Sequence, residues 1–108
     1  MYLVVFEVQP KDDRYDDYLS LAAALRTELE QVDGFISVER FSSLTTPGKI
    51  LSLSAWRDAA AVEAWRGQAR HRAAQERGRR EIFEDYRIRV AEVFRDYDLA
   101  SGRSSAAE

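Results

Sequence analysis

The sequence contains no cysteine and only one histidine, His71. Without thiols the chain can form no disulfide and can carry out no thiolate chemistry. One histidine, with no cluster of carboxylates beside it, cannot complete a zinc or non-haem iron site, so we expect no bound metal. The five glycines are scattered along the chain, which excludes a glycine-rich phosphate-binding loop.

Long apolar runs are also absent. No run approaches the roughly 20 residues that a bilayer span requires, and the first six residues lack the basic region of a signal peptide. These absences predict a cytoplasmic protein that has no membrane partner. The chain of 108 residues suits one domain. We expect that domain over residues 1–99, followed by a C-terminal tail over residues 100–108 that has nothing to bury.

The charge pattern argues against a nucleic-acid partner. The net charge is −3, and although many arginines lie between residues 66 and 95, glutamates and aspartates interleave with them. Mixed signs along a helix favour a solvated, ion-paired surface, whereas phosphate binding requires an uncompensated basic field. We therefore expect no binding of nucleic acid.

Hydrophobic periodicity predicts strands and helices in a definite order. Residues 2–8 form an apolar run, as in a strand buried on both faces. From Arg14, apolar residues recur every three or four positions, as in an amphipathic helix that Asp12 or Asp13 caps and that ends near Gly34. The remaining predicted elements are strands at 35–44 and 50–56, helices at 59–66 and 69–80, and a strand at 86–97. This order predicts an α+β fold of the ferredoxin-like β-α-β-β-α-β type, with a four-stranded antiparallel sheet.

The second face of this sheet is too apolar to face water. Leu3 and Val5 can face the helices while Val4 and Phe6 face away, or the reverse, and either arrangement leaves apolar side chains uncovered. The strand at 50–56 contributes two more leucines, Leu51 and Leu53, that must be covered. Because a monomer rarely exposes an apolar patch of this size, we expect a homodimer in which two sheets pack face to face, a dimeric α+β barrel.

Two segments of the chain and four residues between them form an ordered set of motifs. Residues 34–41 read Gly-Phe-Ile-Ser-Val-Glu-Arg-Phe, and residues 86–91 form part of the last predicted strand. Between them stand a tryptophan at a strand end, an acidic helix cap, a second tryptophan and a histidine, at Trp56, Asp58, Trp65 and His71. This set resembles the antibiotic biosynthesis monooxygenase family over residues 1–97. The resemblance implies the fold and the homodimer more firmly than any one reaction.

The resemblance implies two kinds of chemistry. Some members of this family are cofactor-independent oxygenases of polycyclic phenols, and others bind and open haem. A phenolate can reduce O₂ directly, so the first kind needs only an apolar pocket that excludes water and a group that removes the substrate's proton. We therefore expect a monooxygenase that uses no cofactor and acts on a small aromatic, phenolic or quinone-type molecule. The alternatives are a haem-binding protein and a non-catalytic dimeric ligand-binding domain.

The histidine and the second tryptophan are the candidate catalytic residues. The ordinary pKa of His71 suits proton transfer or haem ligation, and Trp65 would form the pocket wall beside it. From the residues alone, the favoured interpretation of His71 is a helix histidine bonded to a carbonyl, and Trp65 fits a core residue. The candidate substrate-binding residues are Phe6, Trp56, Phe83, Tyr86 and Arg87.

Two of these substrate-binding candidates have alternative interpretations. Trp56 ends a strand and fits a packing residue at the dimer interface. Arg87, like Arg89, alternates with apolar residues and could pair either with a substrate anion or with Glu7 or Glu39 across the sheet.

The haem alternative meets a further absence. Haem-degrading members resemble one another in an asparagine near the end of the first strand, and this chain has no asparagine at all. Glu7 stands at about that position, and the spacing from Trp65 to His71 is shorter than in those enzymes. These departures argue against haem degradation by that arrangement and leave haem ligation open.

Overall fold

The computed structural model describes residues 1–102, with the side chains of Ala69 and Arg70 excepted. One antiparallel sheet contains the strands in the order β2-β3-β1-β4. The strands are β1 (Tyr2–Pro10), β2 (Phe35–Ser42), β3 (Ile50–Trp56) and β4 (Phe83–Glu92). The helices are α1 (Tyr15–Glu30), α2 (Ala59–Arg66), α3 (Ala69–Arg77) and the short α4 (Leu99–Gly102). The order of elements and strands confirms the predicted ferredoxin-like α+β fold.

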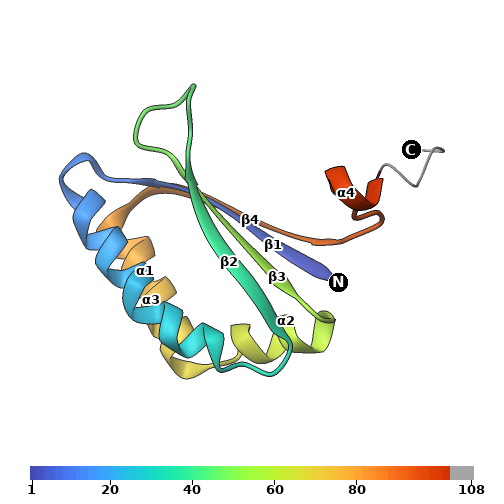
Figure 1. Ribbon diagram of the computed structural model, residues 1–108. Helices are drawn as coiled ribbons and strands as arrows, with labels where there is room; N and C mark the ends of the chain where they lie inside the picture. The colour runs from blue at the N-terminus through green and yellow to red at the C-terminus, as the bar shows by residue number, and fades with distance from the viewer. Residues whose placement is uncertain (103–108) are drawn as a thin grey trace.

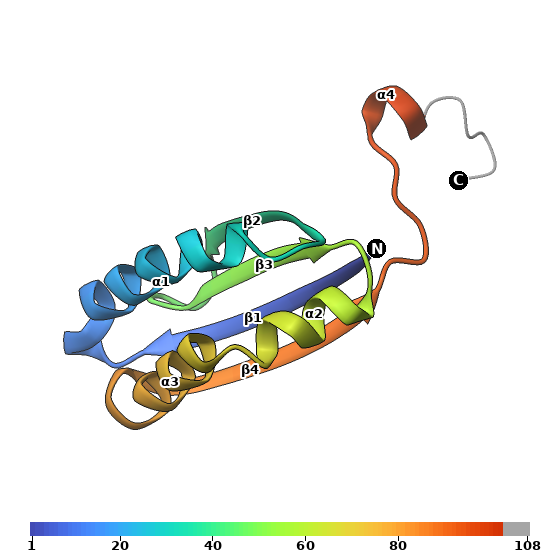
Figure 2. The same ribbon diagram turned by 90° about the horizontal axis from the view of Figure 1, so that it is seen from below.

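Three helices cover one face of the sheet and leave the other face open (Figures 1 and 2). Helix α1 lies along β2 and β3, while α2 and α3 lie along β1 and β4 (Figure 2). Val4 and Phe6 pack against the helix-covered core, so the alternation of the strand places Leu3 and Val5 on the open face. Of the two arrangements considered above, the second is therefore the observed one. None of the helices in the described residues has the length and apolar character that a bilayer crossing needs.

Two clusters of buried side chains fill the space under the helices. The cluster near α2 contains Leu29, Val32, Val38, Trp56, Ala61, Val62 and Trp65. The cluster at the other end of the sheet contains Val8, Tyr18, Ala22, Ile50 and Ile82. The two clusters hold α1 and α2 to the sheet by burial of apolar area, and members of both line the cavity described below.

The helix starts agree with the sequence for α2 but not for α1. Asp58 caps α2, because its Oδ1 accepts a hydrogen bond from a backbone N–H of the first turn at 2.9 Å. The predicted cap of α1 is wrong: both candidate aspartates lie inside a 3₁₀ turn, Asp12–Arg14, and no side-chain hydrogen bond caps the helix at Arg14. A backbone hydrogen bond of 2.7 Å from Lys11 N–H to Ile82 O holds this turn in place. The start of α1 is therefore set by a tertiary contact rather than by a cap.

Gly34 does not end α1 as predicted. The helix ends at Glu30 with Gln31 as its C-cap, and Gly34 comes three residues later, directly before β2. Its φ of +95° lies in the left-handed region that favours glycine. A Cβ at Gly34 would also lie 2.6 Å from the Cβ of Ala61 in α2. Glycine is needed here for a close approach between the start of β2 and α2.

A π-helical turn, Gly78–Ile82, follows α3 in place of the last predicted helical turn. Gly78 is buried and faces the ring of Phe83. A Cβ at this position would lie 2.6 Å from Phe83 Cζ, which is closer than such atoms can pack. The absence of a side chain at Gly78 therefore lets the Phe83 ring occupy its place under α3.

Strand β4 begins and ends earlier than the predicted range of 86–97. It is an edge strand that pairs only with β1, and β1 itself begins at Tyr2. One further hydrogen bond, 2.8 Å from Val93 N–H to Met1 O, closes the ladder. The strand cannot continue beyond this point because its only partner strand extends no further.

The chain then leaves the sheet as an arm that ends in α4 (Figure 2). Phe94 is 91% exposed on this arm and Leu99 is 84% exposed. The predicted tail began at residue 100, and its first three residues belong to α4. Residues 103–108 of that tail lie outside the described residues.

Candidate active site

A cavity of about 130 Å³ lies between the sheet and its helices. All four strands contribute side chains to its floor, and α1 and α3 contribute most of its roof. Strand register arranges the floor in two rows across the sheet, which are Val38–Ser54–Val4–Val90 and Arg40–Ser52–Phe6–Ile88.

The central strand β3 makes room for the cavity with two serines. Ser52 and Ser54 stand in the middle of the two rows, where larger side chains would fill the space below the helices. The Ser54 hydroxyl is buried and accepts a hydrogen bond from Trp56 Nε1 at 2.9 Å. This hydroxyl is therefore satisfied without a ligand.

His71 and Trp65 meet at one side of the cavity. The backbone breaks between α2 and α3 at Gly67, whose N–H donates to Glu63 O at 2.9 Å. The break turns α3 so that His71, in its first turn, returns over the end of α2. The ring centroids of Trp65 and His71 are 4.4 Å apart, with an interplanar angle of 50°. Both side chains line the cavity, as the prediction of a catalytic pair requires.

The surroundings of His71 keep its imidazole neutral. Burial and the positive charge of Arg66 lower the pKa of His71 to about 4, below the ordinary value on which the prediction of proton transfer was based. Its Nδ1 is buried and has no hydrogen-bond partner in the described part of the chain. The alternative interpretation, a histidine bonded to a carbonyl, does not describe this nitrogen. A buried ring nitrogen without a partner is available to a ligand in the cavity.

Three of the predicted substrate-binding residues form an aromatic wall. The ring centroid of Phe6 lies 5.8 Å from that of Phe83 and 6.0 Å from that of Tyr86. Phe83 and Tyr86 are 5.7 Å apart, and all three side chains line the cavity. Offset and tilted rings at these separations pack favourably with one another and offer apolar surface to a flat ligand.

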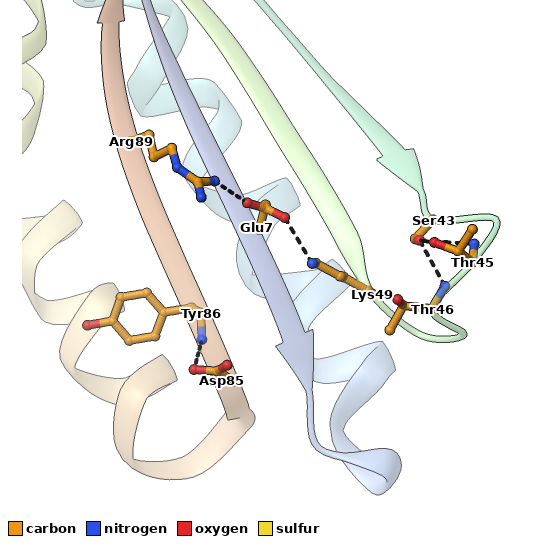
Figure 3. A network of polar contacts seen from close by, with 8 residues as sticks. All are labelled: Glu7, Ser43, Thr45, Thr46, Lys49, Asp85, Tyr86 and Arg89. Carbon is orange, nitrogen blue, oxygen red and sulfur yellow. Dashed lines mark hydrogen bonds and ion pairs between the residues drawn. The ribbon is translucent and has the colours of Figure 1, made fainter.

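The structure does not bring Trp56 or Arg87 to the cavity. Trp56 is fully buried behind Trp65, with the ring centroids 6.3 Å apart, and it packs the core. Arg87 pairs in register with Glu7, so it lies on the open face of the sheet. On that face Arg89 Nη1 contacts Glu7 Oε2 at 2.6 Å, the ion pair that the sequence allowed (Figure 3).

Comparison with known proteins identifies the family. The family model described as antibiotic biosynthesis monooxygenase matches residues 1–77. The chain belongs to the antibiotic biosynthesis monooxygenase family. A protein of Pyricularia oryzae named jasmonate monooxygenase is 48% identical over 93 residues, which are 86% of this chain but only 43% of that protein. The uncharacterized protein YqjZ of Bacillus subtilis is 32% identical over 94 residues, 87% of this chain and 80% of that protein.

Solved structures show the same fold. A candidate antibiotic biosynthesis monooxygenase from Deinococcus radiodurans has a TM-score of 0.81 at 15% identity, over 92% of this chain and 98% of that chain. Rv0793 from Mycobacterium tuberculosis has a TM-score of 0.79 at 16% identity, over 90% of this chain and 98% of that chain. At identities this low, the likeness concerns the fold alone.

Glu7 marks a departure from the haem-degrading antibiotic biosynthesis monooxygenases. It stands near the position where those members resemble one another in an asparagine, but here its side chain lies on the open face. Lys49 Nζ contacts its Oε1 at 2.9 Å, and Arg89 contacts its other oxygen (Figure 3). The hydrogen bonds from Lys49 and Arg89 hold the pKa of the Glu7 carboxyl below its ordinary value. The side chain of Glu7 therefore does not line the cavity.

Tyr18 of α1 and Arg40 of β2 are among the cavity residues that the sequence analysis did not propose for the site. Arg40 Nη2 donates to the backbone oxygen of Ala22 at 3.3 Å. Tyr18 is 4% exposed, and burial raises the pKa of its hydroxyl, while the charge of Arg40 and a hydrogen bond with the Arg40 side chain oppose that rise. The available signal was strand alternation, because Arg40 stands two residues after the core residue Val38 and so on the same face.

The residues that the structure describes contain no group of three or more histidine, aspartate or glutamate side chains able to hold a metal ion. What the cavity offers to chemistry is one neutral imidazole, aromatic surface and the polar ends of its arginines, serines and tyrosines. These groups can transfer a proton and bind a ligand.

Proposed function

We propose that this protein is a cofactor-independent monooxygenase that acts on a small aromatic, phenolic or quinone-type compound held in the cavity. One observation carries the proposal: the neutral His71 lies against Trp65 with an unpartnered Nδ1 beside the aromatic wall. The cavity of about 130 Å³ is smaller than the roughly 300–1,000 Å³ of pockets for drug-sized ligands. Its size favours a small ring compound over a macrocycle such as haem.

The reaction that suits the side chains of this cavity is the oxidation of a ring CH₂ group, as in an anthrone, to C=O. His71 Nδ1 accepts the proton of the substrate, and the resulting anion gives one electron to O₂. The radical pair combines into a peroxide, which takes the proton back from His71 and loses water. One oxygen atom of O₂ ends in the carbonyl and the other in water, and all four electrons come from the substrate. The reaction therefore needs no external reductant.

The other cavity residues hold the substrate and exclude water. The rings of Phe6, Phe83 and Tyr86 provide a flat apolar surface against which an aromatic substrate can be oriented. Trp65 packs on His71 and limits the orientations of its imidazole. A fixed imidazole beside a fixed ring places the proton acceptor near the carbon that reacts.

The test is oxygen uptake with a panel of anthrones and hydroquinones in the presence of a chelator. We expect uptake by the wild type and a loss of about 10²-fold or more in kcat for His71→Ala, the range that general bases contribute. Arg72→Ala, an exposed neighbour on α3, is the matched control and should keep its activity. Uptake that survives His71→Ala unchanged would disprove the role of His71.

Haem binding through His71 is the alternative that the unpartnered nitrogen supports. A titration with haemin distinguishes it, because ligation would shift the Soret band for the wild type and not for His71→Ala. A protein that binds aromatic compounds but shows neither oxygen uptake nor a Soret shift would be the non-catalytic ligand-binding domain.

The name of the Pyricularia relative supports the monooxygenase class. This chain spans only 43% of that protein, so we carry over the class of reaction and not jasmonate as the substrate.

We also propose that the protein functions as a homodimer joined through the open face of the sheet. That face carries apolar side chains from three neighbouring strands, which are Leu3, Val5, Phe41, Leu51 and Leu53. Phe41 is 42% exposed in the single chain. A second sheet packed on this face would remove the apolar patch from water without closing the cavity, which lies on the other side.

A further inference from the structure

The lining of the cavity carries charge of only one sign. Arg26, Arg40 and Arg66 contribute to it, and no aspartate or glutamate of the described residues does. Two of these arginines are neutralised outside the cavity: Arg26 Nε lies 3.0 Å from Glu30, and Arg66 Nη1 lies 3.5 Å from Glu63. Both pairs are at least half exposed, so solvent screens them, although the charge of Arg66 still lowers the pKa of His71. Arg40 differs from both.

Arg40 is the cavity arginine without a carboxylate partner among residues 1–102. Its Nη2 donates to Ala22 O at 3.3 Å, and its Nε is buried with no hydrogen-bond partner in that part of the chain. The neighbouring acid, Glu39, faces the other side of the sheet because the strand alternates. A guanidinium carries five N–H donors. The backbone oxygen of Ala22 and the Tyr18 hydroxyl engage part of this group, and its remaining buried donors cost free energy while they stay unpaired.

The register of the sheet places Arg40 in the same row as Phe6 of the aromatic wall. Arg40 pairs across the sheet with Ser52, which pairs in turn with Phe6. Arg40 and Phe6 therefore stand in one row of the cavity floor, on either side of a serine too small to separate them. A ligand ring lying against Phe6 would present a substituent on its edge to the guanidinium.

We propose that Arg40 binds the negatively charged group of the ligand and that the cavity selects a small ring compound bearing one carboxylate or equivalent anion. The planar guanidinium suits bidentate hydrogen bonding to such a group. The assignment of this ligand as a substrate rests on the proposed function, whereas its charge follows from the lining alone. In this arrangement the anion lies toward β2 and α1, and the ring lies toward His71.

The test compares two probes that differ in charge, 2-naphthoate and its uncharged amide 2-naphthamide, by calorimetric titration of the full-length protein. We expect the wild type to bind 2-naphthoate more tightly by about tenfold or more, the value of a hydrogen bond to a charged group. Arg40→Gln should lose this preference and bind 2-naphthamide within about twofold of the wild type. Equal affinity of the wild type for the two probes would overturn the proposal.

Arg87→Gln is the matched control, because it removes the same charge from the open face of the sheet. It should leave both affinities unchanged. If Arg87→Gln weakened 2-naphthoate binding as much as Arg40→Gln, the preference would come from the net charge of the protein and not from Arg40. If Arg40→Gln fails to fold by circular dichroism, Arg40→Lys keeps the charge but not the fork. It should retain only part of the preference, and full retention would contradict the bidentate contact.

The measurement requires no turnover, so it separates the two proposals. A preference for 2-naphthoate that depends on Arg40, in a protein without oxygen uptake, would support the anion site and remove the oxygenase. Oxygen uptake in a protein that binds both probes equally would support the oxygenase and contradict the anion site.

Discussion

His71 has the only imidazole in the chain, and its titration should be visible in the stability of the fold. Its pKa in the folded protein is about 4, against an ordinary value of 6.5. Between these two values the unfolded chain binds a proton that the folded chain does not. The stability that His71 contributes is therefore fully present above pH 6.5 and is lost as the pH falls toward 4.

Urea unfolding at pH 7.5 and pH 5 measures this effect. We expect the urea midpoint of the wild type to be lower at pH 5 than at pH 7.5. The midpoint of His71→Gln should change much less. The variant is its own control for the carboxylates, which titrate in both proteins. Equal pH dependence of the two midpoints would show that His71 is not shielded from water in the folded state.

The residues of the site were predictable to different degrees for physical reasons. His71 and Trp65 could be predicted because they occupy an ordered pattern of aromatic and histidine positions. Arg87 was placed on the cavity side because the strand carries arginines and apolar residues in alternation, and only pairing shows which set faces the helices. Arg40 was missed because its significance depends on α1 lying above it and on the absence of an acid nearby.

At the scale of elements, the junction between β2 and α2 depends on Gly34. We expect Gly34→Ala to lower the free energy of unfolding by about 1–3 kcal/mol, since alanine would have to adopt a left-handed φ and would contact Ala61. Chemical unfolding measures the change. Gly67→Ala is the matched control, with a φ of −80°, and should cost less than about 1 kcal/mol. Equal losses would show that the left-handed conformation at Gly34 is not under strain.

Element order was predictable from periodicity, but element ends were not. The central apolar run of β1 predicts a buried strand without saying which face each side chain takes, because both faces are apolar. The end of β4 depends on where β1 begins, and the start of α1 depends on a hydrogen bond between Lys11 and Ile82. Each of these limits is set by a segment distant in sequence, so no local pattern reports it.

At the scale of the whole molecule, the open face of the sheet predicts assembly. Leu53 stands between Ser52 and Ser54 in β3, and its neighbours face the cavity, so Leu53 faces outward. We expect the wild type to sediment at twice the chain mass of 12.4 kDa at micromolar concentration. Leu53→Glu should sediment at the chain mass, because a charge would be buried between the two sheets.

The control for this experiment is the same substitution at Leu44. This leucine is fully exposed in the connection between β2 and β3, and Leu44→Glu should leave the assembly intact. A wild type that sediments as a monomer would contradict the homodimer and would leave the open face without a partner.

The contact between Gly78 and Phe83 has a consequence for which ligands can enter. Phe83 lines the cavity, and the tip of its ring occupies the space that a side chain at position 78 would need. Any larger residue at this position would displace the ring, although it would never touch the ligand itself. We therefore expect substitutions at Gly78 to change the shape of the cavity through the Phe83 ring, and so the size of the ligands that fit it.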